Sequence, residues 1–128
     1  MAKRAVRTEK APAPFQGAPY SQGIVNGDLV FVSGQLGIDP ETGQVVEGGI
    51  AEQTERVMLN LQAILEEAGS SLDRLVKTTI FLADLGDFAG LNEVYARFVG
   101  DTPPARATFQ VGALPSGALV EIEAIGHR

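Results

Sequence analysis

The sequence predicts an α+β domain with the element order ββαβαββ, in which a single sheet carries two helices on one face. An Asn-Gly pair at Asn26-Gly27 separates two short apolar runs, as in a tight hairpin. Two later stretches have apolar residues at helical spacing, and the segments around them are rich in β-branched and aromatic residues, as strands are. The length of 128 residues is typical of one such domain.

The first 18 residues differ from the rest in composition. Four of the chain's ten Lys and Arg residues lie in the first ten positions, and prolines among small residues follow them. Proline resists helix formation, and a charged stretch without apolar periodicity has little to bury. We therefore expect residues 1–18 to form a flexible basic leader and residues 19–128 to form a single domain.

Turn residues mark the ends of the first two strands. Asn26-Gly27 favours a type I′ turn, so the residues on either side are expected to pair as a hairpin. Residues 39–43 read Asp-Pro-Glu-Thr-Gly, in which proline presets one dihedral angle and glycine accepts a positive one. The second strand is therefore expected to end before Asp39.

The two helices follow from apolar residues at the spacing of one helical face. Residues 50–68 form the first, and Gly69 ends it. Residues 76–82 then form a strand that is apolar on both faces. Asp87 can cap the second helix, and Gly100 closes it. The predicted core face of the second helix consists of Phe88, Leu91, Tyr95 and Phe98.

Two more strands are predicted over residues 107–114 and 119–125, joined by a turn at Pro115-Ser116-Gly117. Two helices cover only one face of the resulting sheet, yet its strands carry apolar residues on both faces. An uncovered apolar face is typical of an association site, so the pattern predicts a closed homo-oligomer of unspecified size.

Composition excludes several classes of function. The absence of cysteine excludes disulfides, thiolate metal sites and a cysteine nucleophile, and the lone histidine, His127, lies beside the C-terminus. We therefore expect no metal. The net charge is -6, and residues 11–128 alone hold 6 basic and 15 acidic side chains, which disfavours a nucleic-acid partner. No apolar run reaches membrane-spanning length, and we expect a soluble cytoplasmic protein.

The segment around Arg106 is the best candidate for chemistry. Alternation puts Arg106, Thr108 and Gln110 on one face of a strand that two prolines precede. A guanidinium beside a hydroxyl suits bidentate capture of a small carboxylate. The alternative is that Arg106 forms an internal ion pair with Glu121 or Glu123. The residues alone do not decide between carboxylate binding and an internal ion pair.

Several motifs resemble the reactive intermediate deaminase (RidA) family. The resemblance runs from about residue 11 to the end, nearly without gaps. It is carried by Ala11-Pro12, Pro19-Tyr20-Ser21-Gln22-Gly23, Val32-Ser33-Gly34-Gln35, Val76-Lys77-Thr78-Thr79-Ile80-Phe81, Asp87-Phe88-Ala89-Gly90-Leu91-Asn92, Pro104-Ala105-Arg106 and Val120-Glu121-Ile122-Glu123-Ala124-Ile125.

The resemblance implies a chorismate-mutase-like fold, a homotrimer with active sites between subunits, and no cofactor. It also implies hydrolysis of 2-iminobutanoate and 2-iminopropanoate to 2-oxo acids and ammonia. Carried over by position, Arg106 binds the substrate carboxylate, and Glu121 and Thr108 orient the water. The other residues implied in substrate binding are Tyr20, Ser33, Gly34 and Asn92.

Two departures and two other functions accompany this resemblance. Ala18 precedes Pro19-Tyr20 where members often have glycine, and Thr108 replaces a frequent cysteine. Ordinary structural roles remain open for Tyr20, Ser33 and Asn92: an aromatic cap, a turn and a helix surface. The alternative functions are an endoribonuclease and a non-catalytic metabolite-binding or chaperone-like trimer.

A hairpin of the last two strands around Ser116 also bears on the site. It puts Arg106 and Glu121 roughly 16 Å apart along the strands and on opposite faces. If both serve one small substrate, Glu121 is expected to come from a neighbouring subunit.

Overall fold

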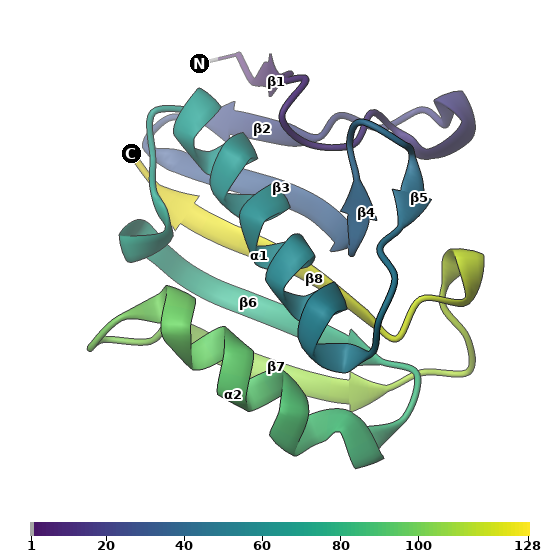
Figure 1. Ribbon diagram of the computed structural model, residues 1–128. Coiled ribbons are helices and arrows are strands. Elements are labelled where there is room, and N and C mark those ends of the chain that lie inside the picture. The colour runs from purple at the N-terminus through teal and green to yellow at the C-terminus, as the bar shows by residue number, and fades with distance from the viewer. Residues whose placement is uncertain (1) are drawn as a thin grey trace.

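The computed structural model describes residues 2–128, and its main feature is a six-stranded mixed sheet with both helices on one face (Figure 1). The helices are α1 (Ile50–Glu67) and α2 (Phe88–Val99). The sheet contains β1 (Arg4–Val6), β2 (Gly23–Asn26), β3 (Leu29–Leu36), β6 (Leu75–Leu82), β7 (Ala105–Gln110) and β8 (Val120–His127), in the order β1-β2-β3-β8-β6-β7. A small hairpin of β4 (Ile38–Asp39) and β5 (Gln44–Val45) lies beside it. The predicted α+β class and the ββαβαββ order are confirmed.

The predicted opening hairpin forms, but with a different turn. Asn26 pairs with Leu29, so the two-residue loop is Gly27-Asp28. Only Gly27 has a positive φ, of 61°. A type I′ turn requires positive φ at both loop residues, whereas type II′ requires it only at the first. The type I′ prediction is therefore wrong, although the hairpin itself is confirmed.

The last two strands do not form the predicted hairpin. β8 lies between β3 and β6, and β7 is an edge strand that pairs with β6 in parallel. The reason is α2, which returns the chain to the starting end of β6, so the next strand runs parallel to it. Residues 111–119 then carry the chain back past β6 to the middle of the sheet.

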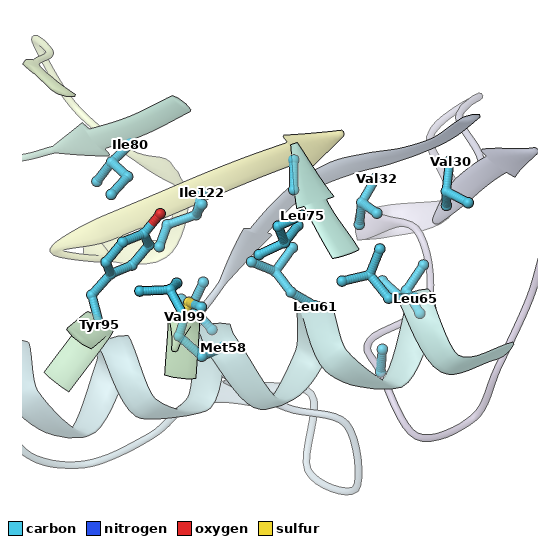
Figure 2. Close-up of a cluster of buried hydrophobic side chains, with 14 of the residues drawn as sticks. Val30, Val32, Met58, Leu61, Leu65, Leu75, Ile80, Tyr95, Val99 and Ile122 are labelled. Carbon is cyan, nitrogen blue, oxygen red and sulfur yellow. The ribbon is translucent and has the colours of Figure 1, made fainter. Parts of the chain in front are cut away.

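The core lies between the helices and the covered face of the sheet (Figure 2). α1 ends before Gly69, whose φ is 85°, as predicted. Its fully buried side chains include Met58, Leu61 and Leu65. They pack against a sheet layer that contains Val30, Val32, Ile80 and Ile122.

The predicted core face of α2 is partly wrong. Its buried residues are Leu91, Val94, Tyr95 and Val99. Phe88 is 42% exposed because it lies at the helix start, beyond the core, beside β7. Asp87 occupies the N-cap position, but its side chain makes no capping hydrogen bond.

The other face of the sheet carries exposed apolar side chains, as the strand pattern predicts. Leu29, Phe31, Val76 and Phe109 are each between 41% and 53% exposed. No helix of the described residues covers this face (Figure 1). A surface of this kind is typical of an interface between subunits.

The N-terminal leader differs from its prediction. Residues 4–6 form β1, which pairs with residues 23–25 of β2 along the sheet edge (Figure 1). Val6 and Ala11 are each only 3% exposed. Two buried apolar residues among charges are too few to give a periodicity, so the sequence pattern conceals this strand.

We expect deletion of residues 2–10 to lower the free energy of unfolding by about 2 kcal/mol, because it removes the buried side chain of Val6. Urea denaturation of the truncated chain measures this change. The double substitution of Lys3 and Lys10 by alanine is the control, since both side chains are exposed. Equal stability of the truncated and full chains would show that β1 contributes nothing.

Candidate active site

Arg106 lies on β7, on the helix-covered side of the sheet, against the start of α2. It pairs in the sheet with Thr78, whose hydroxyl is 2.7 Å from that of Tyr95 in α2. The guanidinium carbon is 5.2 Å from the ring centre of Tyr95 and 5.4 Å from that of Phe88. Nη1 donates a hydrogen bond of 2.9 Å to Oδ1 of Asn92. Two aromatic rings and one amide therefore fix the guanidinium plane.

The alternative ion pair of Arg106 with Glu121 or Glu123 does not form in the described chain. Within residues 2–128, the ion pair within 4.0 Å is that of Arg97 with Glu93, on the exposed side of α2. Arg106 makes one side-chain hydrogen bond there, to Asn92, so its remaining N–H groups have no protein partner in the described chain. A guanidinium in this state suits a ligand carboxylate.

Four other predicted site residues gather at a separate cavity of about 480 Å³. Tyr20, Ser33, Gly34 and Glu121 all line it. The Ser33 hydroxyl donates to the carbonyl of Ser21 at 2.6 Å, so its oxygen lone pairs remain as acceptors.

Gly34 and Glu121 fit closely together in this cavity. The pairing of β3 with β8 shifts between Val32 and Gln35, so the strand bulges at Ser33-Gly34. The Glu121 carboxylate lies over the Gly34 backbone, where a Cβ atom would collide with Oε2 and lie 2.9 Å from the carboxyl carbon. The absence of a side chain at Gly34 thus gives the carboxylate its position.

Burial raises the pKa of Glu121, and the nearby charge of Glu123 raises that pKa further. A carboxyl group with a raised pKa exchanges protons more readily near neutral pH. Glu121 is therefore the titratable group of the cavity best suited to general acid and base catalysis.

Thr108 does not face an open site in the single chain. Its Oγ1 is buried without a hydrogen-bond partner among the described residues. It pairs with Ile80, so it lies on the same covered face as Arg106. The prediction that this hydroxyl orients water has no support from the geometry of one chain.

The structure thus separates the predicted site residues into two groups. Arg106 is level with Ala124, with β6 between them, and Glu121 lies three residues further along β8. The two residues are therefore about 10 Å apart along the strands and about 10 Å apart across them. Glu121 pairs with Phe81, an odd number of positions from Thr78, and so points to the opposite face from Arg106. The predicted opposite faces are confirmed. The hairpin from which they were derived is wrong, and so is its offset of roughly 16 Å, because β7 pairs with β6 and not with β8.

Sequence reasoning missed two aromatic partners of Arg106 and one wall of the cavity. Phe88 and Tyr95 were assigned to the core because their spacing is helical, and no local pattern separates a core ring from a ring beneath a cation. Phe15 lines the cavity with Glu121, although it lies in the segment expected to be flexible.

The described residues contain no candidate for a metal site or for a membrane-spanning helix. Among residues 2–128, no three His, Asp or Glu side chains are grouped so that they could hold a metal ion. No helix in the same residues is both long and apolar enough to cross a membrane.

The fold and the site define a small α+β protein with the Arg106 guanidinium on one face of the sheet and a carboxylate-lined cavity on the other. The chain belongs to the family described as Endoribonuclease L-PSP, whose family model matches residues 8–128.

Individual relatives match over nearly the whole chain. A RutC family protein of Pyrococcus abyssi is 53% identical over 128 residues, covering 100% of this chain and 99% of the relative. A 2-iminobutanoate/2-iminopropanoate deaminase of Capra hircus is 44% identical, covering 98% and 90%. The crystal structure of RidA from the bacterium Psychrobacter has a TM-score of 0.93 and 47% identity, covering 98% and 99%.

Proposed function

We propose that this protein hydrolyses short 2-imino acids, such as 2-iminobutanoate and 2-iminopropanoate, to 2-oxo acids and ammonia. The observation that carries the proposal is Arg106, whose guanidinium is held by two rings and Asn92 with donors left for a carboxylate. The deaminase name of the Capra hircus relative supports the same chemistry.

The reaction needs little from the protein. An iminium carbon is already electrophilic, so an oriented water can attack it without a metal or a strong base. Glu121 accepts a proton from that water as its oxygen bonds to the carbon. Glu121 returns this proton to the nitrogen of the resulting carbinolamine, and ammonia leaves as the C–N bond breaks. Glu121 then takes up the hydroxyl proton as the C–O bond becomes the carbonyl of the 2-oxo acid. Arg106 holds the carboxylate throughout.

The active site would be shared between copies of the chain, in a closed homo-oligomer that we expect to be a trimer. Arg106 and Glu121 point to opposite faces, so one small molecule cannot contact both within a chain. The exposed apolar face, with Phe31 and Phe109, is a surface on which copies can associate. A second copy would then bring its Glu121 to the Arg106 of the first. We also expect the protein to act in the cytoplasm.

A coupled assay tests the proposed function. A threonine dehydratase generates the imine, and the release of 2-oxobutanoate is timed with and without the protein. We expect acceleration that Glu121→Ala abolishes and Glu67→Ala, an exposed carboxylate of α1, leaves unchanged. An unchanged rate of imine decay would refute the proposal. RNA cleavage by the same preparation, in place of imine hydrolysis, would support the endoribonuclease that the family description names.

The pH profile should respond to Glu123. Its charge helps to raise the pKa of Glu121, so Glu123→Gln is expected to lower that pKa. If ionised Glu121 activates the water, the acid limb of kcat/KM moves to lower pH in this variant. A series of kcat/KM measurements across the acidic range checks the direction. If the acid limb of kcat/KM moves to higher pH or stays in place, Glu121 is not the group whose ionisation that limb reports.

A further inference from the structure

The segment of residues 7–18, which we call the N-terminal strap, crosses from β1 to the cavity that contains Glu121. Its Pro12, Ala13, Phe15 and Ala18 line that cavity. Phe15 is 39% exposed and has no place in the hydrophobic core. The ring of Phe15 thus forms an apolar wall of the cavity, and its position depends on the position of the strap.

One buried side chain holds the strap. Gln22 is 3% exposed, and all the hydrogen bonds of its carboxamide go to the strap. Its Oε1 accepts from the backbone N–H of Thr8 at 2.7 Å. Its Nε2 lies within hydrogen-bond distance of the carbonyls of Thr8, Ala11 and Pro12, at 3.0, 3.2 and 2.8 Å. Loss of this amide would leave the Thr8 N–H and the three strap carbonyls without this partner.

The end of the strap is held in an uncommon conformation. Gln16 has a φ of 54°, in the left-handed region that residues other than glycine seldom adopt. Gly17 follows with a φ of 67°. The backbone N–H of Phe15 donates to the hydroxyl of Tyr20 at 2.6 Å, which ties the turn to a side chain that lines the cavity. Such a conformation persists only where the surroundings maintain it, and it often marks a functional segment.

We propose that Phe15 determines which substrate side chains the site accepts, and that Gln22 is the positioning residue that keeps Phe15 in place. The inference rests on the proposed function, because it concerns the same cavity. Glu121 marks the reacting end of the cavity, and Phe15 marks an apolar wall of it. A bulky ring there limits the length of the imino acid side chain, as the walls of hydrophobic pockets do.

The test compares imines made in the assay by an amino acid oxidase from alanine, 2-aminobutanoate and leucine. Wild-type protein is expected to favour the two smaller imines. Phe15→Ala should raise kcat/KM for the leucine-derived imine, relative to the alanine-derived one, by about 10-fold. Gln22→Met should move the same ratio in the same direction, mainly through KM, while the acid limb of the pH profile stays in place.

Ser70→Ala is the matched control. Ser70 is 8% exposed and donates to the His127 carbonyl at 2.6 Å, so its loss also removes a buried hydrogen bond, but outside the residues that line the cavity. It should leave the ratio unchanged. Phe15→Ala keeps the proposal testable if Gln22→Met does not fold.

Binding of 2-oxo acids provides a readout that needs no turnover. The dissociation constant of the leucine-derived 2-oxo acid should fall relative to that of 2-oxobutanoate in Phe15→Ala. If the wild-type protein is active and Phe15→Ala has the same size preference as the wild type, in turnover and in binding, this inference alone is overturned. A wild-type protein with no activity on any imine would overturn the proposed function, and the inference with it.

Discussion

Arg106→Lys is expected to lower kcat/KM for 2-iminobutanoate on the order of 100-fold, although the charge is retained. A guanidinium offers two parallel hydrogen bonds to a carboxylate, and a lysine ammonium does not. The loss corresponds to about 3 kcal/mol of transition-state binding. Lysine also loses the flat surface that contacts Phe88 and Tyr95, so its charge is no longer fixed in one plane.

Steady-state kinetics on purified protein measure this effect. Arg97→Lys is the control, because Arg97 is an exposed arginine whose side chain lies near Glu93 and does not line the site. It should retain wild-type turnover. Near wild-type activity of Arg106→Lys would show that Arg106 does not bind the substrate carboxylate.

Gly34→Ala is expected to lower kcat on the order of 100-fold with little loss of stability. The new Cβ would occupy the position of the Glu121 carboxylate, which must then move away from the water. Moving a general base away from the reacting water lowers kcat by roughly 100-fold or more. The fold can tolerate the change, because the colliding atoms are the end of a flexible side chain and Gly34 does not have a positive φ.

Gly112→Ala is the control for this substitution. A Cβ atom at Gly112 meets nothing within 4 Å, and its φ is not positive. Both variants should unfold at about the same urea concentration as the wild type, and only Gly34→Ala should lose activity. Wild-type turnover in Gly34→Ala would show that the carboxylate position seen here is not needed.

Local pattern was enough to predict most of the elements. The helix predicted over residues 50–68 and the strand predicted over residues 76–82 are confirmed, each to within one residue at one end. Each buries a continuous face whose spacing is visible in the sequence. The partner of β7 was not predictable in this way. Strand pairing depends on contacts far apart in the chain, and the turn near Ser116 resembles a hairpin turn although the chain there crosses to the middle of the sheet.

The site was predicted in part, for a similar reason. Family resemblance located Tyr20, Ser33, Gly34 and Glu121, which the fold brings to one cavity. The opposite faces of Arg106 and Glu121 were predicted from a hairpin that does not form. The true spacing of the two residues depends on how β7 and β8 each pair with β6, which no local pattern specifies. Nor could the resemblance reveal that the leader packs against the sheet, because its buried apolar residues, Val6 of β1 and Ala11 of the strap, lie among charged residues and prolines.

The central claim is that one active site combines Arg106 of one chain with Glu121 of another. Arg106→Ala and Glu121→Ala chains, each expected to be inactive alone, are refolded together in equal amounts, and mixed assemblies are verified by mass. Random mixing in any closed ring leaves about a quarter of the sites with both residues intact, so about a quarter of wild-type imine hydrolysis should return. Mixed assemblies that form and yet recover no activity would contradict the shared site.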